Sequence, residues 1–455
     1  MAATMMACLA ACAPADVADP TPTVPVSDWT PVQATKTDTV PQFWGQVPSN
    51  LLFISLDTFR KDKVAAHGGT GLTPFLDQLM AEGFVLDDHQ QCSNWTYAST
   101  TCTLLGRTNV ENGFMPKLSS VYREPVPDGT PFLAHWLKGA GFYSVLVSSN
   151  SWLSEEWNND QGFDESELPG NRNATNCFEV GVNRVLDAHM RGDITDRWFL
   201  HLHFKEPHPA YSPPDDYLTG LEGLEDVPWD LDSYDAHYES LYSYDLLSEE
   251  ERALLEAHLQ VRYDGEVAYL DDQLRDMFDV LQDYGMLHDT LVVFWTDHGE
   301  QFWEHGDQGH AYSLHGEEND GIAFFWSQNI VADTHTAPTS AIDLVPTVLG
   351  LYDQPIPAEV TGYPVGEAPP DRPRFGESEA RVGPVQSVTV GGVKLQFWWD
   401  GELNLYDRNV DPLESKDLYD PEDPRVAELW ALLEPMVRRA EPLIDESTVT
   451  WPQFD

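Results

Sequence analysis

Short, almost wholly apolar runs recur along the chain, and charged residues follow two of them directly. The run NLLFISL is followed by Asp57, and the run TLVVFWT is followed by Asp297 and His298. An apolar run of this length with polar residues after it is typical of a parallel strand buried on both faces. We therefore expect these three residues at the carboxyl ends of strands, where open α/β sheets place their sites.

Amphipathic segments alternate with the apolar runs. In TPFLDQLMAEG the apolar residues have helical spacing, with Thr73 as the expected N-cap and Gly83 as the stop. FLAHWLKGAGFYSVLVSSN repeats a helix followed by a strand, and a long helix is predicted before TLVVFWT, ending near Gly285. This alternation predicts an α/β fold with a doubly wound, mostly parallel sheet flanked by helices.

Two regions have a different pattern. Residues 209–248 are rich in Pro, Asp and Tyr without clear periodicity, and we expect them to form an insertion over the site. Later, VQSVTVGGVKLQFWWDGELNLYD alternates like antiparallel strands with turns at GG and DG, and RVAELWALLEPMVRRAEP predicts a closing helix. We expect a main domain over 48–352 and a small α+β subdomain over 353–455.

The charge balance restricts the kinds of partner. The chain has 76 Asp and Glu against 25 Lys and Arg, a formal net charge of −51. Such a surface repels nucleic acids and anionic membranes, so we expect no nucleic-acid partner. Two interpretations remain, a solvated acidic surface screened by salt and the recruitment of divalent cations by local carboxylate clusters.

The beginning of the chain resembles an export signal. Residues 1–12 are apolar and rich in small side chains, like a signal-peptide core without its basic flank. Their LAAC resembles a bacterial lipobox, which implies a lipid anchor at Cys12; an ordinary disordered N-terminus is the alternative. Residues 13–47 predict an extended tether, rich in Pro, Thr and Asp. We expect export to a bacterial periplasm or cell surface.

The cysteines do not predict a zinc site, because no C-x-x-C pair occurs. In an oxidising periplasm a disulfide among Cys92, Cys102 and Cys177 is compatible with the sequence, which leaves the pair open.

The charged residues after the two strands suggest metal chemistry. Two carboxylates and an imidazole can bind a divalent ion, with oxygen ligands favouring Ca²⁺, Mg²⁺ or Mn²⁺ and the histidine favouring Zn²⁺. A metal beside a hydroxyl lowers the hydroxyl pKa and makes a nucleophile. In FLHLHFKEPHPAY, His201 and His203 share a strand face, so one of them can be a packing residue. His208 lies in a polar turn and is the expected proton donor to a leaving oxygen.

Seven blocks together resemble the sulfatase family of the alkaline phosphatase superfamily over about residues 48–350. They are NLLFISLDTFRKD, TPFLDQLMAEG, WTYASTTCTLLGR, FLHLHFKEPHPAY, YDGEVAYLDDQL, TLVVFWTDHGEQFWEHGDQGH and IDLVPTVLGL. The resemblance implies a metal ion bound by Asp57, Asp297, His298 and the nucleophile. Counting back from LLGR places Thr96 at the nucleophile position.

The nucleophile block differs from the family pattern. Typical sulfatases carry C-x-P-S-R or S-x-P-S-R, whose first residue becomes formylglycine, whereas here Ala98 stands at the Pro and Thr100 at the Arg. Neither Cys92 nor Cys102 begins such a motif, and we interpret Cys102 as a core thiol. Because a Thr ester is cleaved by water rather than by collapse to an aldehyde, Thr96 favours phosphate or phosphonate esters over sulfate esters.

Further roles follow from the resemblance. His310 stands where many relatives place a Lys that contacts the non-bridging oxygens, and His203 and His305 are candidate substrate neighbours. We expect one divalent ion, Ca²⁺, Mn²⁺ or Zn²⁺. A second ion would need further ligands such as Asp264, Asp271 and His203, whose block resembles an ordinary amphipathic helix.

The expected activity is hydrolysis of a small ester, or of a lipid or sugar head group, through an intermediate on Thr96. The alternatives are a true sulfatase without formylglycine, a head-group transferase, and an inactive binding protein with a sulfatase fold. The sequence leaves the oligomeric state open.

Overall fold

The computed structural model describes residues 36–37, 40–116, 124–170, 172–218, 231, 233–379, 381, 383–444 and 449–452. The predicted signal segment, Cys12 and most of the predicted tether lie outside the described residues. Ala34–Asp455 form one compact unit. None of the helices in the described ranges combines the length and apolar character that crossing a membrane requires.

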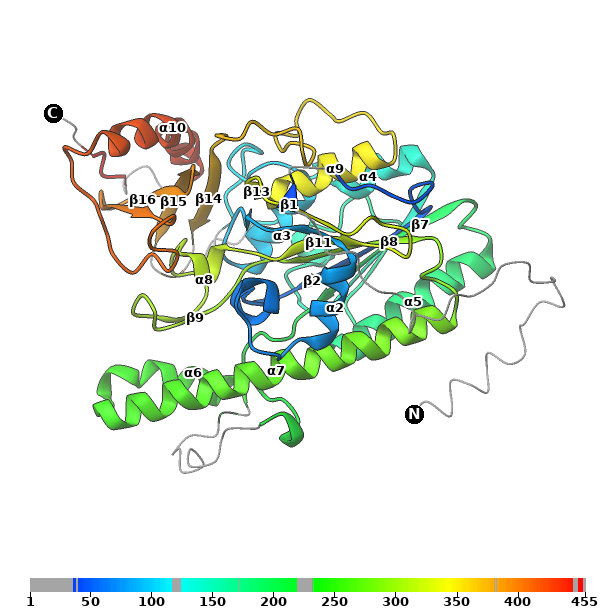
Figure 1. Ribbon diagram of the computed structural model, residues 1–455, viewed down its shortest axis with the longest axis horizontal. Helices are drawn as coiled ribbons and strands as arrows, with labels where there is room; N and C mark the ends of the chain where they lie inside the picture. Colours follow the sequence, from blue (N-terminus) through cyan, green and yellow to red (C-terminus); the bar gives the residue numbers. More distant parts are fainter. Residues whose placement is uncertain are drawn as a thin grey trace. The chain divides into compact units, whose positions relative to one another are not determined.

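The centre of this unit is a sheet of nine strands among the described residues (Figure 1), in the order β1-β12-β3-β11-β8-β2-β7-β5-β6. The strands span Lys36–Thr37 (β1), Asn50–Leu56 (β2), Phe84–Leu86 (β3), Phe142–Ser148 (β5), Glu165–Glu167 (β6), Arg197–Phe204 (β7), Thr290–Thr296 (β8), Ala323–Trp326 (β11) and Asp333–His335 (β12). Only β11 runs antiparallel to its neighbours, β8 and β3, within this described sheet. The predicted mostly parallel sheet is confirmed.

The two strands predicted from NLLFISL and TLVVFWT are β2 and β8, and they are direct neighbours. Their parallel register pairs Leu56 with Thr296. The next residue of each strand, Asp57 and Asp297, therefore leaves the sheet at the same edge and at the same level.

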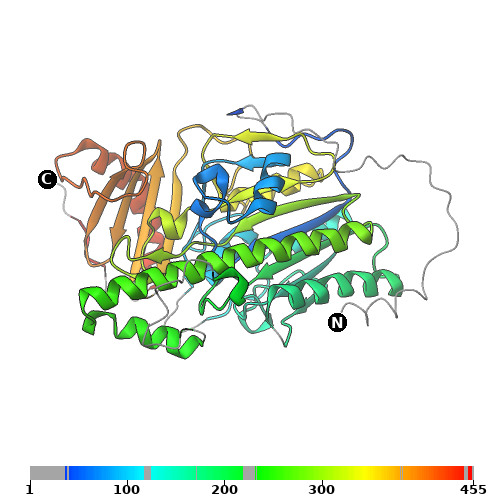
Figure 2. The same cartoon turned by 60° about the horizontal axis from the view of Figure 1, so that its bottom comes forward.

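Helices cover both faces of the sheet (Figures 1 and 2). They span Pro74–Glu82 (α2), Thr96–Leu105 (α3), Leu133–Leu137 (α4), Ala174–Arg191 (α5), Tyr234–Tyr242 (α6), Glu249–Asp283 (α7), Gly316–Asn319 (α8), Leu344–Leu351 (α9) and Pro424–Ala440 (α10). Along β2, Leu52, Ile54 and Leu56 pack toward α2, α5 and α7, whereas Leu51 and Phe53 pack toward α3, α4 and α9. This alternation of side chains in a strand gives the sheet a buried core on each face.

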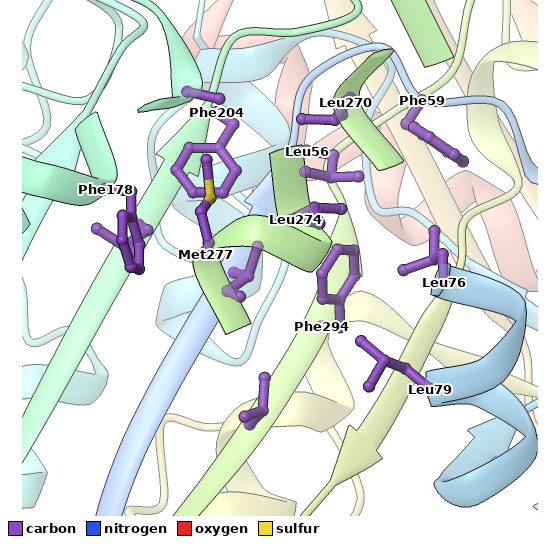
Figure 3. Packing of buried hydrophobic residues seen from close by; sticks show 14 of the residues in the cluster. Leu56, Phe59, Leu76, Leu79, Phe178, Phe204, Leu270, Leu274, Met277 and Phe294 are labelled. Atoms are coloured by element: carbon purple, nitrogen blue, oxygen red, sulfur yellow. The ribbon is translucent and has the colours of Figure 1, made fainter. Parts of the chain in front are cut away.

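The first of these cores is shown in Figure 3. There Leu270, Leu274 and Met277 of α7 pack onto β-strand residues such as Leu56 and Phe294. The helix begins with a capping box between Ser248 and Glu251 and ends at Asp283, close to the end predicted from the sequence. It is continuous for 35 residues.

The C-terminal region has the predicted antiparallel strands and closing helix. The strands are Arg374–Glu379 (β14), Pro384–Val390 (β15), Val393–Trp398 (β16) and Leu403–Asp407 (β17), paired in chain order. Helix α10 packs on this sheet through residues such as Leu433 and Val437. The turns lie at Gly391 and Gly401, where φ is +57° and +104°, as the GG and DG signals predict.

Small elements complete the described part of the chain. Two-stranded ribbons pair His89–Gln90 (β4) with Thr339–Ser340 (β13), and Gln301–Phe302 (β9) with Gln308–Gly309 (β10). Short 3-10 helices span Lys61–Lys63, Ala65–His67, Lys138–Ala140, Glu155–Trp157, Asp215–Tyr217, Tyr244–Leu246, Ala341–Asp343 and Glu441–Leu443.

Two regions are more ordered than the sequence pattern indicates. Within the range expected to form a tether, β1 pairs with β12, and the Trp44 amide donates to the Asn329 carbonyl at 2.7 Å. Within the range expected to be an aperiodic insertion, Tyr234–Tyr242 form α6, which is joined to α7 through a 3-10 turn. Both segments gain contacts with distant parts of the chain that local periodicity does not reveal.

Candidate active site

The carboxyl ends of β2 and β8 bring together Asp57, Asp297 and His298. All three side chains are fully buried, and ligand-type atoms of the three lie within 4.8 Å of one another. The His298 Nε2 atom is 3.4 Å from Asp57 Oδ1 and 3.6 Å from Asp297 Oδ2. The position of the three predicted metal ligands follows from the parallel register of the two strands.

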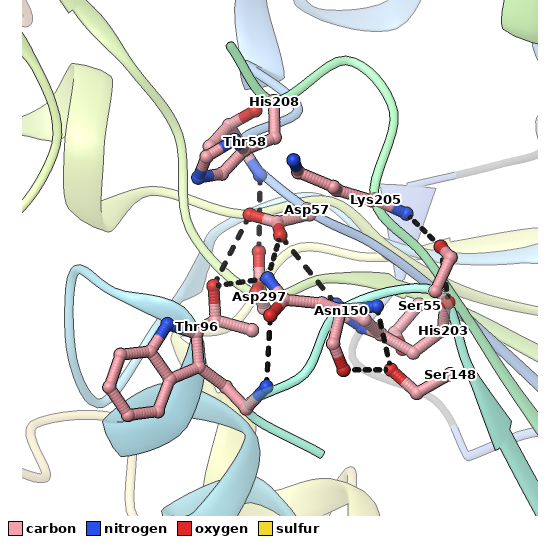
Figure 4. Close-up of polar contacts among 12 residues, drawn as sticks. Ser55, Asp57, Thr58, Thr96, Ser148, Asn150, His203, Lys205, His208 and Asp297 are labelled. Atoms are coloured by element: carbon pink, nitrogen blue, oxygen red, sulfur yellow. Dashed lines mark hydrogen bonds and ion pairs between the residues drawn. The ribbon is translucent and has the colours of Figure 1, made fainter. Parts of the chain in front are cut away.

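Thr96 enters this cluster from the other face of the sheet, as the first residue of α3. Its Oγ1 atom is 3.3 Å from Asp57 Oδ1 and 3.4 Å from His298 Nε2. In Figure 4 the side chains of Asp57, Asp297 and Thr96 point toward one another. The structure thus brings the expected nucleophile and the expected ligands to one buried point.

A disulfide between Cys92 and Cys102 holds the segment around Thr96. The interpretation of Cys102 as a free core thiol is therefore wrong. Cys92 precedes α3 and Cys102 lies within it, and their Cα atoms are 6.5 Å apart, a separation that a disulfide can span. Of the three cysteines that the sequence left open, Cys177 stays free and buried.

Asn150 also belongs to the cluster, although the sequence analysis did not select it. Its Nδ2 donates to Asp57 Oδ2 at 2.5 Å and lies 3.3 Å from Thr96 Oγ1. Asn150 lies just past β5, in the same kind of position as Asp57 after β2. A search for every polar residue that follows an apolar run would have found it.

The backbone fixes which nitrogen of His298 faces the cluster. Its Nδ1 is 2.9 Å from the Gly299 carbonyl, which can only accept, so Nδ1 carries the proton and neutral Nε2 presents its lone pair. Gly299 is required here because a Cβ atom would lie 2.0 Å from the Glu317 carbonyl oxygen. The chain can therefore cross closely behind the imidazole.

Asp297 is held by two amides. Its Oδ1 accepts from the backbone N–H of His298 at 2.7 Å and of Thr58 at 3.2 Å. Thr58 has a φ of +55°, a left-handed conformation that is costly for a β-branched residue and typical of functional sites. Ser99 of α3 donates a hydrogen bond from its hydroxyl to the Asp297 carbonyl, which ties α3 to the residue that follows β8.

The residues present fit a divalent cation. Burial raises the pKa of Asp297, and the facing charge of Asp57 raises it further. Burial alone would raise the pKa of Asp57, but His208 and the other neighbouring histidines hold it below its usual value. Asp297 Oδ2 has no hydrogen-bond partner among the described residues. Two buried carboxylates of this kind match the ligands that hard cations prefer.

The two histidines with expected catalytic roles, His208 and His310, lie close to His298. The imidazole rings of His208 and His310 have centroids 5.2 Å apart, and His310 is 4.5 Å from His298. Burial lowers the pKa of His208 to about 4 and that of His310 to about 3. The Nδ1 of His208 contacts the Pro209 carbonyl at 2.8 Å, and the Nδ1 of His310 contacts Glu300 at 3.0 Å.

Glu300 lies three residues after Asp297 and was given no role from the sequence. It is fully buried, and burial raises its pKa to about 7. Its contact with His310 Nδ1 leaves His310 Nε2 for other partners. At the position where many relatives have a Lys, this chain thus has His310, and the Glu300 carboxyl group contacts the Nδ1 atom of its ring.

His203 lies beneath the cluster. It is fully buried, its Nδ1 is 2.8 Å from Ser55 Oγ, and its Nε2 is 3.8 Å from Asp57 Oδ2. Ser55 Oγ is in turn 2.9 Å from His201 Nε2. The structure therefore places His203 behind Asp57, as the end of a buried polar row.

His305 lies with a second group of three potential ligands, His305, His315 and Glu317. Its Nδ1 contacts Glu317, and its ring stacks on His315 with centroids 3.6 Å apart and planes within 5° of parallel. Parallel stacked rings cannot both direct in-plane lone pairs at one ion. This group therefore does not have the geometry of a metal site.

Three further residues named from the sequence, Thr100 at the family Arg position and the candidate second-ion ligands Asp264 and Asp271, make local structural contacts. Thr100, at the position of the family Arg, donates its hydroxyl to the Thr96 carbonyl at 2.6 Å inside α3. Asp271 accepts the amides of Phe75 and Leu76 at the start of α2, and Asp264 pairs with Lys63 at 2.8 Å. The contacts of Asp264 and Asp271 are structural and lie outside the Asp57 cluster.

Two cations near the cluster were not selected from the sequence. Lys205 follows β7 and lies in the close-up of Figure 4, and Arg381 donates from Nε to the His310 carbonyl at 3.1 Å. Arg381 stands far along the chain in the C-terminal region, so no local signal connects it with this site.

Comparisons with known proteins identify the family and the fold. A family model described as Sulfatase matches residues 49–354, more than half of the chain. An arylsulfatase from Clostridium perfringens is 24% identical over 296 residues, which cover 61% of this chain and 58% of that protein. The chain thus matches less than two thirds of the length of this relative.

Solved structures share the fold. One, determined in complex with its substrate D-glucosamine-2-N,6-O-disulfate, has a TM-score of 0.66 at 17% identity and covers 87% of this chain and 98% of its own. A phosphonate monoester hydrolase from Silicibacter pomeroyi has a TM-score of 0.65 at 19% identity, with 88% and 96% covered. The chain belongs to the sulfatase family, a family of ester hydrolases in the alkaline phosphatase superfamily.

Proposed function

We propose that the protein hydrolyses phosphate, phosphonate or sulfate esters through a covalent intermediate on Thr96. The observation that carries this proposal is the position of Thr96 Oγ1, between Asp57 Oδ1 at 3.3 Å and His298 Nε2 at 3.4 Å. A buried hydroxyl between two proton acceptors is poised to lose its proton, as a nucleophile must.

Asp57, Asp297 and His298 would hold the divalent cation, with Thr96 as the further ligand that the family resemblance implies. When bound, the cation would lower the pKa of the nearby hydroxyl and offset the negative charge of the ester group. Ca²⁺, Mn²⁺ and Zn²⁺ are the candidates. Asn150 donates to Asp57 Oδ2, which leaves Asp57 Oδ1 to accept from Thr96.

In the first step the Thr96 oxygen bonds to phosphorus or sulfur, the Thr96 proton passes to the Asp57 carboxylate, and the bond to the alcohol oxygen breaks. Protonated His208 would give its proton to the departing alkoxide. In the second step water attacks and gives a proton to His208, and the bond to Thr96 breaks as the threonine oxygen takes back the proton from Asp57. Because burial lowers the pKa of His208 to about 4, it must gain its proton when the anionic substrate enters.

His310 and Lys205 would contact the non-bridging oxygens. His310 Nδ1 contacts Glu300, which leaves Nε2 for the substrate. With a protonated Glu300 donating to Nδ1, the neutral imidazole carries its proton on Nε2 and can donate it to an anionic oxygen.

Phosphorus esters are the first choice because the chain lacks the formylglycine motif at Thr96, Ala98 and Thr100. The fold shared with a phosphonate monoester hydrolase supports this choice. A sulfatase without formylglycine, a head-group transferase and an inactive binding protein are the alternatives. Export to a periplasm or cell surface is part of the proposal, and the disulfide supports it because disulfides persist in oxidising compartments.

The test assays purified protein on 4-nitrophenyl phosphate, phenylphosphonate and sulfate, after chelation and with single additions of Ca²⁺, Mn²⁺ or Zn²⁺. We expect one of the added ions to restore the turnover that chelation removes. Thr96→Ala should abolish this turnover, and Thr96→Ser should keep a part of it. Thr101→Ala, in the same helix, is the matched control. Full activity in Thr96→Ala would exclude the assigned nucleophile.

A further inference from the structure

The ribbon formed by β9 and β10 connects two residues of the candidate site. Glu300 directly precedes β9, and His310 directly follows β10. The two strands pair in antiparallel register, and His305 lies in the turn between them. Because each strand has only two residues, the position of this turn bears directly on both Glu300 and His310.

The side chain of His305 joins this turn to two other parts of the molecule. Its Nδ1 contacts the carboxylate of Glu317 in α8, and its Nε2 lies 3.1 Å from the Glu414 carbonyl oxygen in the C-terminal region. Figure 1 shows β9 and α8 on the side of the molecule that carries the C-terminal sheet. A carboxylate and a carbonyl oxygen only accept hydrogen bonds, whereas a neutral imidazole has a single N–H. Both contacts are therefore hydrogen bonds only when each ring nitrogen of His305 carries a proton.

The surroundings of His305 favour the protonated ring. Burial by itself would lower the pKa of His305, but the hydrogen bond and the negative charge of Glu317 raise it above its usual value. The ring of His315 stacks on His305 with centroids 3.6 Å apart. Burial, together with the positive charges of His305 and Lys394, lowers the pKa of His315 to about 2. His305 is thus the charged ring of this stacked pair.

The C-terminal region meets His305 with a carbonyl oxygen, while the carboxylate of the same residue binds two cations. The Glu414 carboxylate lies 2.7 Å from the Lys394 ammonium and 3.0 Å from Arg408 Nε. These two positive charges offset its negative charge. The charge that pairs with His305 is therefore chiefly that of Glu317.

We propose that protonated His305 is a positioning residue of the candidate site. The imidazolium fastens the turn of the ribbon to α8 and to the C-terminal region, and so holds Glu300 and His310 in place. When the ring loses a proton, one of its nitrogens presents a lone pair to an acceptor, and that contact becomes repulsive. The inference rests on the proposed ester hydrolysis, in which His310 contacts the non-bridging oxygens, and adds a regulation by pH to it.

NMR titration of protein with ¹³C-labelled histidine measures the protonation of His305, whose signal is assigned by its absence in His305→Gln. We expect a pKa above the usual 6.5. In Glu317→Gln this pKa should fall by about one to three pH units, because the opposite charge is lost. Glu304→Gln is the matched control, since Glu304 adjoins His305 but pairs with Arg60 at 2.6 Å, and it should leave the pKa close to the wild-type value. A wild-type pKa at or below 6.5, or one that Glu317→Gln does not lower, would overturn the proposal.

Hydrogen exchange reports on the turn without any turnover of substrate. The Trp303 amide donates to the Asp307 carbonyl at 2.7 Å, and the Gly306 amide donates to the Trp303 carbonyl at 3.1 Å. We expect the protection factors of these two amides to fall about tenfold or more between pH 6 and pH 8.5, the size expected for the loss of one hydrogen bond to a charged group. In His305→Gln they should be equal at both pH values, because glutamine does not titrate. Equal protection at both pH values in the wild type would exclude the release of the turn.

Kinetics separate the positioning role from the hydrolysis itself. For the ester that the wild-type protein cleaves best, the ratio of kcat/KM in the wild type to that in His305→Gln should be about tenfold at pH 6 and approach one at pH 8.5. Most of the difference should lie in KM, because His310 contacts the oxygens of the substrate. The same ratio at both pH values would overturn the positioning role and leave the hydrolase. If no ester is turned over, the proposed function fails, while the contacts of His305 stand or fall with the NMR titration and hydrogen exchange.

Discussion

Thr96 is positioned by side chains from three separate strand ends. Asp57 follows β2, Asn150 follows β5 and His298 follows β8, and each has an atom within 3.4 Å of Thr96 Oγ1. Because the three strands are parallel or share parallel neighbours, one sheet edge collects all of them. The position of the Thr96 hydroxyl thus depends on residues that lie far apart in the sequence.

Removing Asn150 should test this dependence. In Asn150→Ala, Asp57 loses a hydrogen bond at 2.5 Å, and hydrogen bonds to charged groups contribute about 1.5–3 kcal/mol. We expect kcat for the best ester to fall about tenfold to a hundredfold, measured by steady-state kinetics. Asn409→Ala, in an exposed turn of the C-terminal region, should keep the wild-type kcat. An equal kcat in both variants would contradict the assigned contact.

The sequence predicted part of this residue-scale picture. Asp57, Asp297 and His298 were selected because they follow apolar runs, and the structure brings them together. Asn150 obeys the same rule but is uncharged, so chemistry alone did not select it. The partner of Cys102 was not predictable, because spacing along the chain does not give the distance between two Cα atoms.

At the scale of elements, helix α3 is fixed to its surroundings from both sides. The disulfide joins its interior to the segment before it, and β14 holds that same segment. The Ser93 hydroxyl donates to the Glu377 carbonyl at 2.6 Å, and the Glu377 amide donates to the Cys92 carbonyl at 3.0 Å. The C-terminal sheet therefore supports helix α3 directly.

Loss of the disulfide should lower stability. Closing a loop with a sequence separation of 10 residues is expected to contribute about 2–4 kcal/mol to the free energy of unfolding. We expect the Cys92→Ser/Cys102→Ser double variant to show this decrease in urea titrations. A thiol reductant should destabilise the wild-type protein and leave the double variant unchanged. Equal sensitivity of both proteins would argue against the bond.

The Glu377 side chain should make stability depend on pH. Burial raises its pKa to about 8 from the usual 4.5. Between these two values the folded state keeps a proton that the unfolded state loses, so unfolding free energy should fall by about 1 kcal/mol per pH unit as pH rises. In Glu377→Gln this slope, measured by urea titration from pH 5 to 8, should be shallower. The exposed Glu428→Gln variant should keep the wild-type slope.

Periodicity predicted the long elements well and the α6 segment poorly. Strands β2 and β8 are buried on both faces, so their apolar pattern is continuous and easy to detect. Helix α6 contains three tyrosines that lie at least partly in solvent and one buried histidine, and its mean pattern is neither apolar nor amphipathic. Its inner contact, between His237 and Tyr211, is tertiary and has no local signal.

At the scale of the whole molecule, the net charge of −51 opposes folding through repulsion between carboxylates. Salt shortens the range of this repulsion, from about 30 Å at 0.01 M ionic strength to about 3 Å at 1 M. The decrease in the free energy of unfolding that this repulsion causes should therefore become smaller as salt is added.

We expect the midpoint temperature of unfolding to rise between 0.05 M and 1 M NaCl at pH 7.5. At pH 5.5, closer to the sequence pI of about 4.3, the protein carries less charge, and the same increase in salt should raise the midpoint less. Scanning calorimetry at the two pH values measures this difference. A salt effect of equal size at both would show that screening is not its cause.

The overall architecture was predictable in class and less so in detail. Alternating strands and helices implied the parallel sheet, and the sulfatase-like order of blocks agrees with the family match over residues 49–354. The antiparallel β11, the edge strand β1 and its neighbour β12 are short, and their pairing is set by long-range contacts. Sequence pattern alone contains no information on that order.

Helix α7 connects three parts of the molecule through one continuous rod. Tyr263 donates to the Thr58 carbonyl at 2.7 Å beside Asp57, Asp271 caps α2, and Tyr244, in the turn from α6, contacts Glu256. An α-helix advances 1.5 Å and turns 100° per residue. One residue inserted between Glu256 and Tyr263 would therefore rotate the part of α7 that contacts Tyr244 by about a quarter turn relative to the part that contacts Thr58. The helical phase of α7 thus fixes how the α6 segment is oriented relative to the sheet edge that carries Asp57.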